Sequence, residues 1–162
     1  MRAFFAILLA LAATGTSAAA QDAVYIIRHA EKELFGADPA LTPEGRRRAL
    51  DWAEMLKNMG VEAIITSDAL RTQETGGLIA NVLGLQPTMV PANDIAGLLD
   101  TLEFDHEEDR VLIVAHAETI PHILERLGVQ EDISIAQSEF ANLFILLQPA
   151  SGDPLYLHLL MP

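Results

Sequence analysis

The sequence predicts an α/β protein: a three-layer α/β/α sandwich with a mostly parallel sheet and an antiparallel edge. Short apolar runs rich in β-branched residues alternate with segments of helical spacing along most of the chain. Such alternation is typical of parallel sheets with helices on both faces. Near the C-terminus, residues 142–147 and 155–160 are separated by a turn rich in Pro, Gly and Ser, which predicts a hairpin closing one edge.

The first twenty residues have the features of an export signal. Met1-Arg2 is a short basic start, residues 3–13 are almost wholly apolar, and small residues lead to Ala18-Ala19-Ala20. This pattern predicts a secretory signal peptide over residues 1–20, with an uncleaved membrane anchor as the alternative. We therefore expect one domain over residues 21–162, periplasmic or secreted, with no membrane contact after cleavage.

Composition narrows the possible partners and chemistry. About 140 residues remain after the signal segment, enough for one domain with a sizeable core. The chain has no Cys, which excludes disulfides and thiolate metal sites. Its net charge of −13 makes nucleic acids and anionic membranes poor partners, so a bound anion needs a local basic pocket. Nothing in the pattern indicates a particular oligomeric state.

The first predicted element is a buried strand over residues 24–27, which ends in Arg28-His29. Residues 33–40 read as a loop, since Gly and Pro interrupt them. A helix then begins after Thr42 as N-cap, with a proline in its first turn, and ends before Gly60.

The second strand and helix repeat this arrangement. Residues 61–66 predict a strand, and Ser67-Asp68 is expected to open a helix that runs to Gly84. Arg71 lies in its first turn. An exposed helix arginine is the simpler interpretation, but the carboxyl end of a strand is where α/β sheets keep their ligand sites.

Two further pairs of a strand and a helix complete the alternation. Residues 87–91 predict a short edge strand, and Asn93 or Asp94 is expected to cap the next helix. Residues 111–115 form the strongest predicted strand, which ends in His116 before a helix with a proline near its start. A second buried strand therefore ends in a histidine.

Four side chains are expected to meet at one edge of the sheet. If the strands before Arg28, Arg71 and His116 are neighbours, these residues and His29 share the carboxyl edge. Two guanidinium groups and two imidazoles suit a tetrahedral dianion, because each guanidinium can donate paired hydrogen bonds to phosphoryl oxygens. The sequence therefore predicts a phosphate pocket.

In order and context, these segments resemble the histidine phosphatase superfamily, also called phosphoglycerate mutase-like, and especially its short bacterial members similar to phosphohistidine phosphatases. Four segments are similar to its motifs: Arg28-His29-Ala30-Glu31 to its Arg-His-Gly motif, Leu41-Thr42-Pro43-Glu44-Gly45 to its following helix start, residues 67–75 to its Ser-x-x-x-Arg-x-x-x-Thr segment, and Ala115-His116 to its second histidine. The resemblance covers nearly all of residues 21–162 and implies the phosphoglycerate mutase-like fold.

The resemblance implies a covalent mechanism. Neutral His29 attacks phosphorus, and water releases the phosphohistidine that forms. Arg28, Arg71 and, if protonated, His116 stabilise charge on the equatorial oxygens, with no metal or other cofactor. One ring nitrogen of His29 must face phosphorus while the other donates to a fixed acceptor, expected to be a backbone carbonyl. Nearby positive charge should keep this ring neutral.

The chain also departs from the family pattern. Ala30 and Ala115 replace common glycines, and Glu118 brings a carboxylate near the expected anion. We expect Glu118 to turn away as a helix cap. No residue clearly matches the glutamate that protonates the leaving group. Asp94 is the best candidate, with Glu31 and Glu118 as alternatives.

The expected function is that of an exported, metal-independent phosphatase acting on phosphomonoesters or phosphoramidates through His29. The substrate is a phosphorylated small molecule, an envelope sugar or a protein. A missing proton donor matters less for a good leaving group, such as phosphohistidine or an aryl phosphate. The alternative is a catalytically silent phosphate-binding or interaction module. A metal site using His116 and His122 is weaker, because their spacing of six places them on no common helical face.

Overall fold

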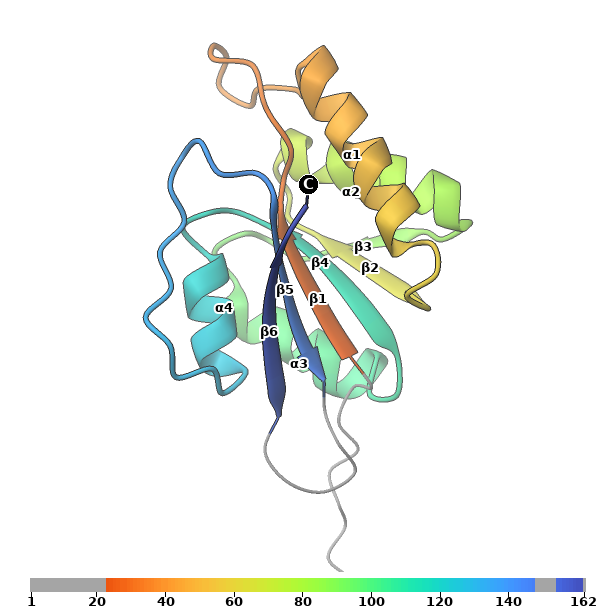
Figure 1. Ribbon diagram of the computed structural model, residues 1–162, viewed down its shortest axis with the longest axis vertical. Coiled ribbons are helices and arrows are strands. Elements are labelled where there is room, and N and C mark those ends of the chain that lie inside the picture. Colours follow the sequence, from red (N-terminus) through yellow and green to blue (C-terminus); the bar gives the residue numbers. More distant parts are fainter. Residues whose placement is uncertain (1–22, 148–153, 162) are drawn as a thin grey trace, which may run out of the picture.

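The computed structural model describes residues 23–147 and 154–161, so the predicted signal segment lies outside the described residues. One mixed sheet of six strands has the order β3-β2-β4-β1-β5-β6 (Figure 1). None of the helices in the described ranges is long and apolar enough to span a bilayer. The elements are β1 Ala23–Arg28, α1 Pro43–Leu56, β2 Ala63–Thr66, α2 Leu70–Leu83, β3 Pro87–Met89, α3 Ile95–Asp105, β4 Arg110–Ala115, α4 Ile120–Arg126, β5 Asn142–Leu147 and β6 Leu155–Leu160.

The sheet topology brings the three predicted site segments together. Strands β1 to β4 are parallel, β5 runs antiparallel to β1, and β5 and β6 form the edge hairpin. Val114 of β4 is paired with Ile27 of β1 on one side and Thr66 of β2 on the other. The three strands therefore end at the same level, and the predicted fold class is confirmed.

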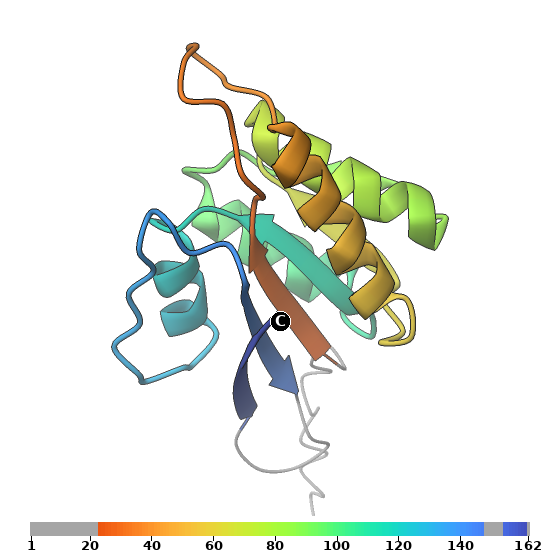
Figure 2. The same ribbon diagram turned by 45° about the horizontal axis from the view of Figure 1, so that its top comes forward.

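Helices cover both faces of the sheet, α1 and α2 on one and α3 and α4 on the other (Figures 1 and 2). Alternate strand residues point to opposite faces. Tyr25 and Ile27 pack with Trp52 of α1, whereas Val24 and Ile26 belong to the cluster under α3 and α4. Trp52 and the two isoleucines have no exposed surface, and each fully buried side chain of this kind stabilises the fold by about 1.5–3 kcal/mol.

The start of α1 packs directly against the chain that follows β1. As predicted, Thr42 is the N-cap: its Oγ1 accepts a hydrogen bond of 3.0 Å from the N–H of Gly45. A Cβ added to Gly45 would lie 2.1 Å from the carbonyl oxygen of Glu31. Only glycine allows this approach, so Gly45 fixes the path of the segment after His29.

The start of α2 differs from the prediction. The helix begins at Leu70, and its N-cap, Ala69, makes no side-chain capping bond. The expected capping residues have other partners: Asp68 Oδ1 accepts from the N–H of Ala92 at 2.9 Å, and Ser67 Oγ lies 2.9 Å from His116 Nε2. Tertiary contacts therefore take the polar groups that would otherwise cap the helix.

Candidate active site

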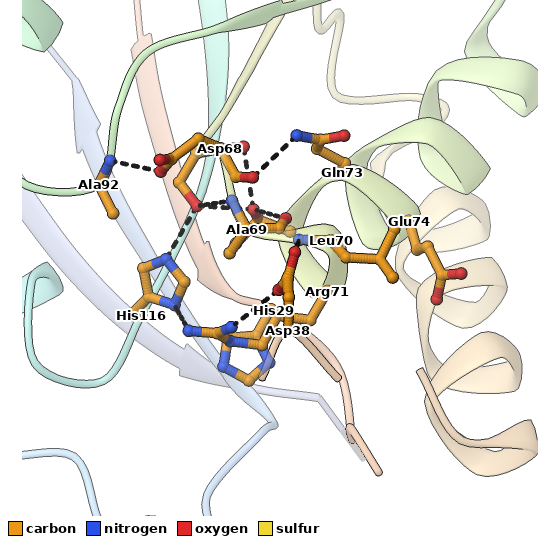
Figure 3. Close-up of polar contacts among 12 residues, drawn as sticks. His29, Asp38, Asp68, Ala69, Leu70, Arg71, Gln73, Glu74, Ala92 and His116 are labelled. Atoms are coloured by element: carbon orange, nitrogen blue, oxygen red, sulfur yellow. Dashed lines mark hydrogen bonds and ion pairs between the residues drawn. The ribbon is translucent and has the colours of Figure 1, made fainter. Parts of the chain in front are cut away.

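The four predicted side chains meet at the carboxyl edge of the sheet. Arg28 ends β1 and His29 follows it, His116 follows β4, and Arg71 lies in the first turn of α2. The rings of His29 and His116 have centroids 5.4 Å apart, and Arg71 Nη2 lies 3.2 Å from His116 Nδ1 (Figure 3). The structure thus brings two guanidinium groups and two imidazoles to one place.

His29 is buried and held in one tautomer. Its Nδ1 lies 2.8 Å from the carbonyl oxygen of Ala30, and a carbonyl only accepts, so Nδ1 carries the proton and Nε2 keeps a lone pair. Burial lowers the pKa of His29 from 6.5 to about 3, and the charges of Arg28 and Arg71 act in the same direction. The expected backbone acceptor and neutral ring are confirmed.

His116 is neutral in the opposite tautomer. Arg71 only donates, so His116 Nδ1 accepts from it, and the ring proton sits on Nε2, which donates to Ser67 Oγ at 2.9 Å. Burial first, and then the charge of Arg71, lower the pKa of His116 from 6.5 to about 4. The protonated His116 considered from the sequence is therefore not its form at neutral pH.

Arg28 is clamped by the loop between α4 and β5. Its Nη1 donates to the carbonyl oxygens of Ala136, Gln137 and Glu139, each at 3.0 Å. Its Nη2 donates to Gln137 Oε1 at 3.0 Å, and the guanidinium carbon lies 4.2 Å from the centroid of the Phe140 ring. The loop thus holds both terminal nitrogens and fixes the orientation of the side chain.

Both arginines keep one buried N–H without an acceptor. Arg28 Nε and Arg71 Nε make no hydrogen bond within the described parts of the chain. Buried cationic donors are costly to leave unpaired, at about 1–3 kcal/mol or more each. Because both belong to side chains beside His29, an anion that reaches them would gain two charge-assisted hydrogen bonds.

Glu118 is exposed, and its charge acts on Arg28 and His116. The N-cap of α4 is Thr119, so the expectation that Glu118 caps this helix is wrong. Glu118 Oε1 accepts from Gln137 Nε2 at 2.8 Å. The pKa of the Glu118 carboxyl lies below its ordinary value because it accepts from its own backbone N–H, then because of Gln137 and the charge of Arg28. It is therefore ionised at neutral pH and offers no proton.

The other two candidate proton donors have partners elsewhere. Glu31 Oε1 lies 2.6 Å from Arg48 Nη2, on the α1 side of the site. Asp94 Oδ1 accepts from the N–H of Gly97 at 2.8 Å, so Asp94 is the N-cap of α3, as predicted. Asp94 and His116 line the same mostly apolar crevice beside α3. The role of Asp94 as proton donor stays a prediction.

Several residues that shape the site were not singled out from the sequence. Thr75 Oγ1 accepts from the N–H of Ala30 at 3.1 Å and donates to the carbonyl oxygen of Arg71 at 2.7 Å, so it ties the two segments together. Thr75 ends the Ser-x-x-x-Arg-x-x-x-Thr segment, so the sequence could have indicated it. Gln137 stands in a loop whose sequence matches no motif. No sequence pattern indicates Asp38 either, whose Oδ1 lies 3.6 Å from Arg71 Nη1.

The described residues contain no group of three His, Asp or Glu side chains arranged to hold a metal ion. His122, the partner considered for His116, has a side chain that is 67% exposed and lies 3.9 Å from Glu125.

Comparison with known proteins agrees with this geometry. Residues 24–94, which include Arg28, His29 and Arg71, match the model of the histidine phosphatase superfamily (branch 1). A probable phosphoglycerate mutase GpmB of Cronobacter sakazakii is 39% identical over 75 residues, or 42% of this chain and 35% of that protein. The corresponding protein of Yersinia pestis is 40% identical over 74 residues, or 41% and 34%. The chain thus spans about a third of the length of these curated relatives.

Solved structures resemble the chain over most of its length. The protein histidine phosphatase SixA complexed with tungstate has a TM-score of 0.68 at 19% identity, covering 85% of this chain and 96% of that one. A putative phosphohistidine phosphatase SixA of Agrobacterium tumefaciens has a TM-score of 0.58 at 19% identity, covering 79% and 92%. The resemblance to the histidine phosphatase superfamily is confirmed, in sequence over residues 24–94 and in fold beyond them.

Proposed function

We propose that this chain is a phosphatase that hydrolyses phosphomonoesters or phosphoramidates through a phosphohistidine on His29. One observation carries the proposal: neutral His29 has Nδ1 bonded to the Ala30 carbonyl and lies beside two arginines whose Nε groups lack acceptors. A free Nε2 lone pair next to unpaired cationic donors is what attack on a phosphoryl group requires.

The reaction has two steps. His29 Nε2 uses its lone pair to form a bond to phosphorus while the bond from phosphorus to the leaving oxygen or nitrogen breaks and its electron pair goes to the leaving group. The Ala30 carbonyl, which accepts from Nδ1, stabilises the positive charge that the ring acquires. Water then attacks phosphorus, the bond to Nε2 breaks, and the ring regains its lone pair as inorganic phosphate leaves.

The charged groups of the site favour this transfer. Arg28 and Arg71 supply positive charge for the phosphoryl oxygens, so we propose that no metal ion is needed. Neutral His116 acts through Arg71, to which its Nδ1 is bonded.

The carboxylates bear on the choice of substrate. Glu118 is ionised, Glu31 is paired with Arg48, and Asp94, the remaining candidate, accepts from the N–H of Gly97 at the start of α3. Weak proton donation favours leaving groups that need little help, such as the imidazole of a phosphohistidine or a phenolate, over alkoxides. Among the expected substrates, a protein phosphorylated on histidine or a small molecule with a good leaving group therefore fits best, and a phosphorylated envelope sugar, which leaves as an alkoxide, fits less well.

A catalytically silent phosphate-binding module is the second candidate, and the lack of a free proton donor among the described residues favours it. Ionised Glu118 acts on Arg28 and His116 and would weaken the binding of a dianion in either case. Such a module would bind vanadate or phosphate without forming a covalent intermediate.

Export is a separate proposal that rests on the sequence of residues 1–20. The basic start, the apolar stretch and the small residues before Gln21 support cleavage after Ala20 and a periplasmic or secreted product. N-terminal sequencing of the protein from a periplasmic fraction tests it: a chain starting at Gln21 is expected, and a membrane-bound chain retaining Met1 would favour the anchor.

Turnover of para-nitrophenyl phosphate tests the enzymatic proposal. We expect turnover by the wild type that is unchanged by EDTA, and none by His29→Ala. His122→Ala is the matched control, because His122 is exposed and outside the site. Full activity in His29→Ala would exclude His29 as the nucleophile, and phosphate binding without turnover would support the silent module.

A further inference from the structure

Two buried hydroxyl groups lie behind His116. Ser67 Oγ is 2.9 Å from His116 Nε2 and 2.7 Å from Thr72 Oγ1, and Thr72 Oγ1 is 2.7 Å from the carbonyl oxygen of Ala69. Ser67 is 6% exposed and Thr72 is fully buried. In Figure 3, Ala69 lies on the Nε2 side of the His116 ring, and Arg71 lies on its Nδ1 side. Polar groups this deep in the protein must satisfy one another.

The donor and the acceptor in each of these hydrogen bonds can be assigned from the neighbouring groups. Arg71 Nη2 can only donate, so His116 Nδ1 accepts and His116 Nε2 donates to Ser67 Oγ. The Ser67 oxygen also accepts from the N–H of Ala69 at 3.2 Å, so its own proton goes to Thr72 Oγ1. Thr72 in turn donates to the carbonyl oxygen of Ala69. Each group therefore donates to the next, from the Arg71 guanidinium through His116, Ser67 and Thr72 to the carbonyl oxygen of Ala69.

We propose that Ser67, supported by Thr72, is a positioning residue that fixes His116 in the Nε2–H tautomer and thereby holds Arg71 in place. With Nε2–H bound to Ser67, the Nδ1 lone pair faces Arg71 Nη2. Arg71 Nε then stays as the N–H that has no protein acceptor. The functional importance of this arrangement rests on the proposed phosphatase activity, but the tautomer itself does not.

A purely local role for Ser67 does not account for these contacts. Ser67 does not cap α2, which begins three residues later without a side-chain cap. Its bond to the N–H of Ala69 is the longest of its contacts, at 3.2 Å, against 2.7 Å to Thr72 and 2.9 Å to His116. The Ser67 hydroxyl therefore makes a shorter hydrogen bond to the His116 imidazole than to the N–H of Ala69 in its own turn.

The tautomer can be read directly by NMR. The chain has five histidines, so long-range ¹H–¹⁵N spectra of protein labelled in its histidines contain few signals, and His116→Asn assigns the relevant one. We expect His116 to show the Nε2–H pattern in the wild type. In Ser67→Ala the ring loses its fixed acceptor, so its two nitrogen shifts should move toward each other as both tautomers become populated.

Thr72 supplies a second pair of variants. Thr72→Val is nearly isosteric but removes the hydroxyl that accepts from Ser67, and should show the same change in the His116 spectrum more weakly. Thr72→Ser keeps the hydroxyl and should restore the wild-type pattern. Thr101→Val, which removes a hydroxyl bonded to the Gly97 carbonyl in α3, is the control and should leave His116 unchanged. If Ser67→Ala does not fold, the comparison of Thr72→Val with Thr72→Ser decides.

Kinetics add a functional readout. We expect kcat/KM for para-nitrophenyl phosphate to fall about tenfold or more in Ser67→Ala, because small displacements of a group that positions the reaction are costly. An Nε2–H signal that is unchanged in Ser67→Ala and Thr72→Val would overturn the proposal, whatever the activity. A wild type with no turnover but with the tautomer shift in Ser67→Ala would instead contradict the phosphatase assignment and leave the positioning role intact.

Discussion

His29 and His116, whose rings lie 5.4 Å apart, carry their single protons on opposite nitrogens. His29 donates from Nδ1 to a backbone carbonyl, and His116 donates from Nε2 to a serine hydroxyl. The first arrangement frees Nε2 of His29 as a nucleophile, and the second turns Nδ1 of His116 toward Arg71. Two residues of the same type thus have different chemical roles because their hydrogen-bond partners differ.

The low pKa values of these histidines predict how stability depends on pH. Their pKa values fall from 6.5 in an unfolded chain to about 3 and about 4 in the folded one. Between these values the unfolded state binds protons that the folded state does not, so stability should decrease as the pH falls below about 6.5, by up to about 1.4 kcal/mol per pH unit for each ring. Urea unfolding followed by Trp52 fluorescence measures this slope.

A substitution checks the source of that slope. His29→Asn removes one of the two groups. Between about pH 6.5 and 4.5 its free energy of unfolding should therefore fall less steeply than that of the wild type, by the slope that corresponds to the uptake of about one proton. His122→Asn, at an exposed position, should keep the wild-type slope. Equal slopes in all three proteins would show that His29 titrates normally.

The same protonation state governs the rate of phosphoryl transfer. A nucleophilic histidine with an ordinary pKa of 6.5 would lose activity as the pH drops through that value. Because His29 stays neutral to about 3, we expect the burst of para-nitrophenol that reports phosphoenzyme formation to keep its rate from about pH 7.5 to about pH 5. Rapid-mixing measurements with a pH-corrected extinction coefficient test this. A decline centred near pH 6.5 would mean that the ring is exposed to normal protonation.

Gln137 links Arg28 to Glu118, since its Oε1 accepts from one and its Nε2 donates to the other. Gln137→Ala should loosen Arg28 and lower kcat/KM about tenfold, because the cation that stabilises the transferring phosphoryl group loses part of its clamp. Steady-state kinetics on para-nitrophenyl phosphate measure the effect. Gln130→Ala, at an exposed position in the same loop, is the control. Equal kinetics for both variants would exclude a role for Gln137.

Gly45 is predicted to be irreplaceable for steric reasons. A Cβ at this position would meet the Glu31 carbonyl oxygen at 2.1 Å, so Gly45→Ala should destabilise the fold by about 1–3 kcal/mol. Gly77 in α2 has open space around the same position, and Gly77→Ala should stabilise by about 0.5–1 kcal/mol through its helix propensity. Thermal unfolding of the pair compares the two effects. Similar changes in both variants would mean that the contact with Glu31 is not rigid.

Much of this site could be predicted because its residues follow strong strand patterns. The apolar runs before His29 and His116, and the strand and helix around Arg71, predict that these side chains share one edge of a parallel sheet. The cap of α1 by Thr42 and that of α3 by Asp94 were also predictable, because capping depends on local sequence.

The remaining features depend on contacts between distant parts of the chain. Gln137 binds Arg28 across 109 residues, from a loop with no periodic pattern. Ser67 reads locally as a helix cap, but His116, 49 residues away, takes its hydroxyl. The neutrality of His116 depends on burial and on an arginine 3.2 Å away, and neither is visible in the sequence. Local patterns therefore predict where the side chains lie but not how they are protonated or bonded.

Trapping the covalent intermediate tests the central claim most directly. Wild-type protein is mixed with a labelled phosphodonor, quenched in alkali, digested and mapped by mass spectrometry. We predict an alkali-stable, acid-labile phosphate on the peptide that contains His29, which is absent from His29→Asn and present in His122→Asn. Turnover of the donor with no label on His29, or with label on another residue, would contradict the account.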